Sequence, residues 1–497
     1  MENLTSYGNF NLYGDELWGK LNLANENTTL YLRTEGDRTS ISPASNIYGR
    51  LHDHTFISCL NCVGGNTPSF RLSNDGKDST SWECFPHQVL IGDTHFYPDT
   101  DKITKAWFST TDIHRIFNDY DSFGAIIEPP ETLRKLIPEK IGERPTPIGP
   151  KPRIVYFSGR EELLQSDLDF GILKVQHGLS REVRSERVSL TSHMHIQIEF
   201  TEPVNLEDLL AEFISLGQFF SLIAGRPQAI ENIQFLKTTN SGEEKYLRLH
   251  WSLGPKLVGE QELDVPSHID TPLDGIRRSE EFEHVLKNWF NNKENALARS
   301  RLYACRLHGK NFNTDRLVAA ANLFDLTFTE NMNTVSPELK SALEGCLSLL
   351  KATPNSYDRD SLIQAIKRVG SPTLMNKTLA RAEIIRSYFI LNNLDKVIRQ
   401  AILCRNYFVH GEGDSRFNYS AAKPFISFLT ETLEFVFATS ELITCGWEAN
   451  NWRLRSHTGH HWFVRFIHYY ENDSQALIAA LEAADLQKGK IASKRII

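Results

Sequence analysis

The sequence lacks any long uninterrupted apolar segment. Its most apolar late stretch, residues 425–445, is broken by Glu431, Glu434 and Glu441, whereas a membrane-spanning helix needs about 20 predominantly apolar residues. Residues 1–10 contain no basic stretch followed by an apolar run, which is the pattern of an export signal. We therefore expect a soluble, cytoplasmic protein with no membrane partner.

Cysteine is scarce, with seven residues in a chain of 497. An odd number of widely scattered cysteines does not form a disulfide framework and suits a reducing cytoplasm. Cys59, Cys62, Cys84 and His87 have the ligand types and paired spacing of a zinc site. However, Cys59 and Cys62 lie three positions apart in an alternating strand and are expected to face opposite sides. Buried core cysteines are the favoured interpretation, and zinc is the alternative.

Motifs of several common enzyme classes are also missing. The chain contains no Walker-type phosphate loop, no GxSxG and no HExxH. These absences argue against an NTPase, a serine hydrolase and a zinc protease. We predict no cofactor.

The chain has no overall excess of positive charge, because its formal net charge is −8. A nucleic-acid coating over the whole surface is therefore not expected. The charge is nevertheless uneven, since residues 361–411 contain eight Lys or Arg residues and two acidic residues. Both an RNA-facing surface and a solvated helix face explain such a segment. Its basic residues are Lys367, Arg368, Lys377, Arg381, Arg386, Lys396, Arg399 and Arg405.

Residues 1–128 are predicted to form an antiparallel β-rich domain. Short alternating runs at 20–23, 29–32 and 55–63 are separated by Gly, Asn and Asp clusters, as in a half-buried sheet. The side chains expected to face the core are Trp18, Leu21, Leu23, Leu30, Leu32, Phe56 and Leu60.

Seven of the twenty prolines lie in residues 129–152, interleaved with Lys, Glu and Gly. Such a segment cannot hold a regular element and is expected to be a connector. Residues 153–273 are predicted to be a second α+β part, with strands at 154–157 and 193–200. A helix is expected to follow Asn205, which is a suitable N-cap.

Residues 274–497 are predicted to form a helical bundle. Apolar residues recur at helical spacing in 282–290 and 317–328, and further helical runs cover 361–369, 378–391, 394–410 and 423–443. The expected fold class is therefore α+β, with an N-terminal β-rich region followed by a C-terminal α-helical bundle.

Polar residues gather at the end of the helix predicted for 394–410. Arg405, Asn406 and His410 precede Gly411, which is suited to end a helix. Asn406 and His410 share a helix face, so the amide is placed to hydrogen-bond the imidazole. Arg405 and His410 are about 140° apart around an ideal helix. Their convergence on a phosphate would require a bent helix end or two copies of the chain facing each other.

Metal-free RNA cleavage needs a group that removes the 2′-OH proton, a group that protonates the leaving 5′ oxygen, and positive charge on the phosphorane. His410 and Arg405 are residue types that supply these functions. The alternative is that both are ordinary helix-terminal residues, which the helix dipole stabilises. The RxxxxH spacing alone leaves both interpretations open.

The order of these features resembles a known family. An Arg-Asn-x-x-x-His motif late in a helix of an all-helical domain is similar to that of HEPN ribonucleases. The whole chain resembles the ApeA family of bacterial anti-phage proteins, which joins an N-terminal β-rich module to a C-terminal HEPN domain. The stretches that carry the resemblance are 56–60, 89–92, the 206–227 helix with Phe219-Phe220-Ser221-Leu222-Ile223-Ala224-Gly225 at its end, and the motif at 405–410.

The resemblance implies a metal-independent endoribonuclease of anti-phage defence that acts by abortive infection through 2′-OH attack. Arg405 and His410 from both subunits of a homodimer would form its catalytic site, with Asn406 beside the arginine. RNA is the implied substrate, and a phage-derived trigger the implied activator. The rival hypothesis is a non-catalytic HEPN-like module that binds RNA or protein. The predicted substrate-binding residues are Arg381, Arg386, Lys396 and Arg399.

A second group of cations and aromatic residues lies near the C-terminal end. Stacking on single-stranded RNA and packing against the bundle both explain its composition, and a metal site is a third interpretation. We retain the group as a candidate substrate or partner surface. Its members are Arg453, Arg455, His457, His460, His461, Arg465 and His468, with Trp452, Trp462, Tyr469 and Tyr470.

Overall fold

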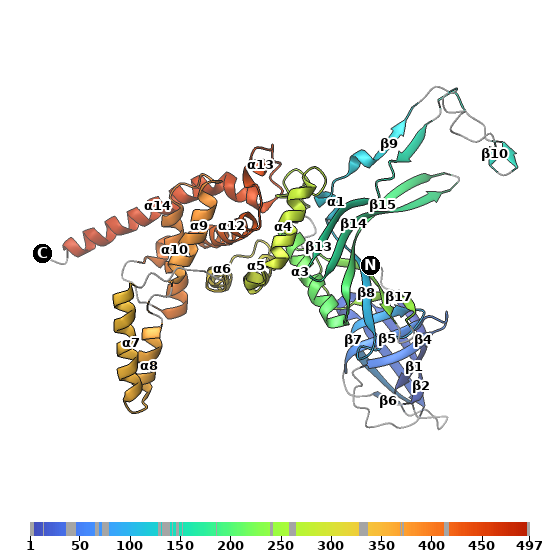
Figure 1. Ribbon diagram of the computed structural model, residues 1–497, viewed down its shortest axis with the longest axis horizontal. Coiled ribbons are helices and arrows are strands. Elements are labelled where there is room, and N and C mark those ends of the chain that lie inside the picture. The colour runs from blue at the N-terminus through green and yellow to red at the C-terminus, as the bar shows by residue number, and fades with distance from the viewer. Residues whose placement is uncertain are drawn as a thin grey trace. The chain divides into compact units, whose positions relative to one another are not determined.

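The computed structural model (Figure 1) divides the chain into two compact units. Unit 1 comprises residues 1–220, 228–257 and 273–283, and unit 2 comprises residues 221–227, 258–272 and 284–497. The structure describes residues 4–494 except 13, 36–45, 65–68, 72–78, 128–130, 132–139, 142, 146–148, 152, 185, 239–241, 258–264, 328–335, 368, 370–371 and 412–416.

The first half of unit 1 is a closed antiparallel barrel. Strand β7 pairs with β3 on one side and with β5 on the other, and the ring is completed through β2, β1 and β4. Figure 1 shows this barrel in blue. The strands are β1 (Leu4–Leu12), β2 (Asp15–Leu23), β3 (Thr29–Glu35), β4 (Asn46–Leu51), β5 (Phe56–Gly64) and β7 (Ser79–Gly92), and β6 (Ser69–Arg71) pairs with β7.

The same sheet continues beyond the barrel. Strand β8 (Lys102–Thr110) pairs with β15 (Val188–Val204) and with β16 (Ile230–Thr238), so residues predicted to form two separate parts, 1–128 and 153–273, share one sheet. The remaining strands of this extension are β13 (Glu162–Leu168), β14 (Gly171–Val183) and β17 (Glu244–Trp251).

Helix α3 (Leu206–Ala224) packs against this sheet extension. It begins as predicted, because Oδ1 of Asn205 accepts a hydrogen bond from the backbone N–H of Asp208 at 2.8 Å. Phe213 of the helix contacts Phe108 of β8, with ring centroids 4.5 Å apart. The buried apolar face of α3 therefore covers part of the sheet.

Several short elements complete unit 1. The predicted connector at 129–152 lies largely outside the described residues, and its described part contains two two-residue strands. The short elements are α1 (Ile113–Ile116), β9 (Phe123–Ile126), β10 (Lys140–Ile141), β11 (Arg144–Pro145) and β12 (Ile154–Phe157).

Most of the predicted inward-facing side chains are buried, but Trp18 and Phe56 are not. Leu21, Leu30 and Leu32 are buried, whereas Trp18 is 42% exposed and stacks on Tyr7. Because Leu17 points inward, the alternation of the strand turns Trp18 outward. The prediction of Trp18 as a core residue is wrong.

The cysteines of the barrel also lie in its core. Cys59, Cys62 and Cys84 are buried among apolar side chains, and burial raises the pKa of Cys59. Asn61 has a φ of +49° and is left out of the pairing between β5 and β7. The left-handed backbone at Asn61 interrupts the strict alternation of the strand, so Cys59 and Cys62 both face the core rather than opposite sides. Among the described residues, no group of three His, Cys, Asp or Glu side chains is arranged to hold a metal ion.

Unit 2 is helical, as predicted. The centre of the bundle is α12 (Ile426–Thr444), which α6 (Thr314–Asp325), α9 (Leu374–Arg386), α10 (Leu394–His410) and α14 (Trp462–Lys494) contact. The other helices are α4 (Ser279–Asn291), which begins in unit 1, α5 (Ala296–Leu307), α7 (Pro337–Ala352), α8 (Tyr357–Lys367), α11 (Tyr419–Ala422) and α13 (Ala449–Arg453). In the described part of the chain, no helix is both long enough and apolar enough to cross a membrane.

Buried ion pairs attach the surrounding helices to α12. The carboxylate of Glu441 accepts hydrogen bonds from Arg299 of α5 at 2.6 Å and from Arg381 of α9 at 3.2 Å. Two helical turns earlier, Glu434 accepts a hydrogen bond from Arg316 of α6 at 2.7 Å. Both glutamates are fully buried. The glutamates that interrupt the apolar sequence of α12 therefore hold α5, α6 and α9 against it.

Candidate active site

Helix α10 carries the Arg-Asn-x-x-x-His motif on its last turns. Its apolar face is buried through Val397, Ile398 and Ala401, among others. The helix ends at Gly411, whose φ of +78° and N–H bond to Tyr407 O at 3.0 Å match the predicted glycine stop. Consequently the motif lies at the end of a helix whose other face is anchored in the bundle.

Arg405 and His410 meet within one chain. Nη1 of Arg405 lies 3.3 Å from Nε2 of His410, and the histidine is exposed. Because a guanidinium only donates, Nε2 accepts and the neutral ring carries its proton on Nδ1. The expectation that the two do not form a close pair unless the helix end bends or a second copy of the chain faces the first is thus corrected. The long arginine side chain spans the angular separation at the helix end.

Two amides orient the Arg405 guanidinium. Oδ1 of Asn406 accepts a hydrogen bond from Nη1 at 3.2 Å. The helical spacing predicted a hydrogen bond from this amide to the imidazole of His410, but the amide bonds the arginine instead. Oδ1 of Asn322, on α6, accepts from Nη2 at 3.2 Å. Asn322 was not predictable from the sequence, because residues 83 positions apart are brought together only by packing of α6 against α10.

Arg405 also lines a cavity of about 620 Å³ at the surface of unit 2. Arg301 of α5 faces the same cavity and is exposed. Nε of Arg405 is buried and has no hydrogen-bond partner among the described residues. Two guanidinium groups therefore border this cavity, together with the side chain of Asp325.

The predicted substrate-binding residues are not equivalent. Lys396 and Arg399 are exposed on α10. Arg386 is exposed too, but it forms ion pairs with Glu383 at 3.0 Å and with Asp395. Arg381 is only 8% exposed and its charge is paired with Glu441. The assignment of Arg381 to an RNA-facing surface is therefore corrected, and Arg368 of the same basic segment lies outside the described residues.

Aromatic rings surround the last turn of α10. Tyr407 stacks on Tyr419 with centroids 5.0 Å apart and an interplanar angle of 13°. Phe408 meets Tyr419 edge-on at 5.3 Å, and Phe417 lies 5.7 Å from Tyr407. All four side chains are partly exposed. Such rings beside a cationic motif suit contact with unpaired bases.

Several residues of the C-terminal cluster at 453–470 are buried or hydrogen-bonded within unit 2. His461 is fully buried, accepts from Phe463 N–H at Nδ1 and lies 3.2 Å from Leu222 O through Nε2. Burial lowers the pKa of His461 to about 3. Asp270 accepts backbone N–H bonds from Thr458 and His460. Most of the cluster thus stabilises one loop of unit 2.

A helical domain with an Arg-Asn-x-x-x-His motif at the exposed end of a bundle helix defines unit 2 as a HEPN-type domain. Comparison with protein families agrees. The model of ApeA N-terminal domain 1 matches residues 6–289, and the model of the Apea-like HEPN domain matches residues 318–451, which include the motif and Asn322. The chain therefore belongs to the ApeA family, and this membership supports a HEPN-family anti-phage effector. No curated protein and no solved structure matches it.

Proposed function

We propose that the protein is a metal-independent endoribonuclease of anti-phage defence, with Arg405 and His410 as its catalytic pair. The observation that carries the proposal is the 3.3 Å contact between Arg405 Nη1 and His410 Nε2 at an exposed helix end of the HEPN domain. A base and a phosphate-binding cation stand together there, which is what 2′-OH attack requires.

The contact suggests how the site acts on RNA. A phosphate that enters the cavity would take the Nη1 donor of Arg405, because a charged acceptor binds a guanidinium more strongly than a neutral imidazole does. Nε2 of His410 would then be free to accept the 2′-OH proton. Asn322 and Asn406 would keep the guanidinium in place during this exchange.

A second histidine is needed for the leaving group. One neutral imidazole removes the 2′-OH proton, but the departing 5′ oxygen must receive a proton from another acid at the same moment. We propose that His410 of a second copy of the chain supplies it, in a symmetric homodimer. Lys396 and Arg399 would bind the flanking phosphates.

The proposal is tested by RNA cleavage in EDTA with purified wild-type protein, Arg405→Ala and His410→Ala. His284→Ala is the matched control, because His284 is an exposed histidine of unit 2 outside the site. We expect cleavage by the wild type and His284→Ala, and a loss of at least about a hundredfold in the two site variants.

Equal activity in all four proteins would overturn the site assignment. A wild type that binds RNA and leaves it intact, in the presence of phage-infected cell extract, would favour the rival function of a non-catalytic RNA- or protein-binding module. The extract is included because a phage-derived trigger is part of the proposal.

A further inference from the structure

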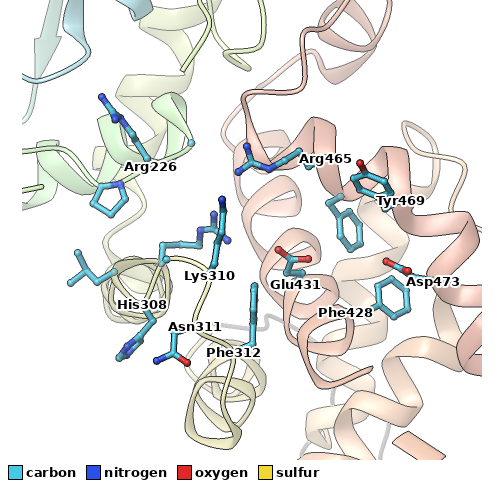
Figure 2. Close-up of a pocket in the computed structure, with 16 residues that line it drawn as sticks. Arg226, His308, Lys310, Asn311, Phe312, Phe428, Glu431, Arg465, Tyr469 and Asp473 are labelled. Atoms are coloured by element: carbon cyan, nitrogen blue, oxygen red, sulfur yellow. The ribbon is translucent and has the colours of Figure 1, made fainter. Parts of the chain in front are cut away.

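A second, larger cavity in unit 2 contains neither residue of the catalytic pair. It measures about 830 Å³ and lies between the loop at 307–312, helices α12 and α14, and residues 225–227, all of which belong to unit 2. Figure 2 shows its lining side chains. The volume is within the range of about 300–1,000 Å³ that is typical of small-molecule sites.

One side of the cavity is basic. Figure 2 shows Arg226 and Lys310 on the side of the 307–312 loop, with Arg465 at the upper edge. Arg465 is held in place, because its Nη1 donates to the carbonyl of His460 at 3.0 Å. Lys310 is exposed and forms no ion pair among the residues that the structure describes. These groups present positive charge to the cavity.

Two carboxylates also line the cavity, and the positive charges of Arg306 and Arg465 act on the first of them, Glu431. Glu431 stands between Lys310 and Phe428 in Figure 2, and Asp473 lies beyond it near Tyr469. Neither carboxylate has a hydrogen bond or an ion pair with any described residue. Burial raises the pKa of Glu431 and the pKa of Asp473. Each therefore lacks a hydrogen-bond donor among the residues that the structure describes.

Aromatic rings form the wall beside these acids. Phe428 of α12 and Phe466 of α14 stack with centroids 6.4 Å apart and an interplanar angle of 20°. Tyr469 lies one helical turn from both Phe466 and Asp473 and is exposed. Rings of this kind provide flat surfaces on which a base stacks.

We propose that this cavity binds a guanine mononucleotide. The basic side, with Lys310, would hold the phosphate, Glu431 would accept from the ribose hydroxyls, and Asp473 would accept from the base, which stacks beside Tyr469. This order follows the sequence of cations, first carboxylate, aromatic ring and second carboxylate in Figure 2.

Guanine fits the carboxylate of Asp473 better than the other bases. Its Watson–Crick edge places two adjacent donors, N1–H and the 2-amino group, opposite the two oxygens of a carboxylate. Adenine offers one donor beside a ring-nitrogen acceptor, which a carboxylate repels. Hypoxanthine keeps N1–H but lacks the 2-amino group, so it isolates the contribution of the second hydrogen bond.

Calorimetric titration of the full chain with GMP, IMP and AMP tests this proposal. No RNA is present, so the outcome is independent of whether the protein cleaves RNA. We expect GMP to bind about ten times more tightly than IMP and about a hundred times more tightly than AMP, since a paired edge discriminates by such factors. Asp473→Asn should reduce the affinity for GMP to that for IMP.

Two further variants separate the ends of the ligand. Lys310→Ala should weaken the binding of GMP about tenfold and leave the affinity for guanosine unchanged, because only the phosphate contact is lost. Asp485→Asn is the matched control for Asp473→Asn, since it removes an exposed carboxylate on the same helix. It should bind GMP like the wild type.

The proposal is overturned if the wild type binds no guanine nucleotide at millimolar concentration, or if GMP and AMP bind equally. It is also overturned if Asp473→Asn keeps the full preference for GMP while its thermal unfolding midpoint matches that of the wild type. Binding of a guanine-ended oligonucleotide without binding of GMP would likewise contradict a mononucleotide site.

Discussion

Nη1 of Arg405 lies 3.3 Å from Nε2 of His410, although the two residues are five positions apart in one helix. The pair is therefore assembled before any partner or substrate arrives. Asn322 holds the same guanidinium from α6, so the position of the charge depends on how two helices pack. We expect the activity of the site to be sensitive to changes outside the motif.

Asn322→Ala tests this dependence. Removal of the acceptor frees Nη2 of Arg405, and a small displacement of a catalytic group costs a large factor in rate. We expect kcat to fall about tenfold with little change in the thermal unfolding midpoint. Asn322→Asp, which retains the acceptor, should lose less. Asn376→Ala, an exposed position on α9, is the control, and equal losses at 322 and 376 would refute the positioning role.

Lys396 and Arg399 are expected to bind phosphates without contributing to chemistry. Each single Ala substitution should weaken RNA binding and reduce the slope of log affinity against log salt by about 0.7–1. The slope is measured by filter binding at several salt concentrations. All proteins in this experiment also carry His410→Ala, so that the RNA is not cleaved. An unchanged slope in both variants would remove these residues from the RNA-facing surface.

Glu441→Ala should destabilise unit 2 strongly. The substitution leaves Arg299 and Arg381 buried without their carboxylate, and the loss of one partner from a buried pair costs about 3–5 kcal/mol. Chemical denaturation followed by circular dichroism measures the free energy of unfolding. Glu482→Ala, an exposed position on α14, should change it by less than about 0.5 kcal/mol. Similar values for both variants would contradict the anchoring role of Glu441.

His461 should make unit 2 less stable in acid. Its pKa is lowered to about 3 by burial in the folded protein, whereas the unfolded chain takes up the proton near pH 6.5. The contribution is therefore fully present above pH 6.5 and is lost as the pH falls from 6.5 toward 3. Between pH 6.5 and 4 the loss is at most about 3 kcal/mol.

The variant His461→Gln isolates this contribution. Its thermal unfolding midpoint should be lower than that of the wild type at pH 7.5, and the difference should shrink as the pH approaches 4. A constant difference over this range would show that protonation of His461 does not control acid stability.

Local pattern was sufficient to predict much of the fold. The helical period located α10, and glycine and asparagine marked its end at Gly411 and the start of α3 at Asn205. Strand alternation located the core side chains of the barrel, but it assigned Trp18 to the wrong face, since a large aromatic residue is apolar on either face. The α+β fold class, with a β-rich region before a helical bundle, is confirmed.

Features that depend on long-range packing were not predictable in this way. The single sheet joins β8 to β15 and β16, which local pattern cannot pair. Arg381 belongs to a basic segment of the sequence, yet it forms a buried ion pair with Glu441, which is 60 positions away. Nothing in the sequence around Asn322 marks it as a residue of the site. The left-handed backbone at Asn61, which turns Cys62 into the core, was likewise not predictable from the local pattern.

Analysis of the RNA ends tests the central claim most directly. A short RNA that the wild type cuts in EDTA is compared with the same RNA carrying a single 2′-deoxy nucleotide at the cut position. Attack by the 2′-OH with Arg405 and His410 predicts a 2′,3′-cyclic phosphate and a 5′-OH, no cut at the deoxy position, and no cut by His410→Ala. A 5′-phosphate with a 3′-OH, or cleavage at the deoxy position, would contradict the account.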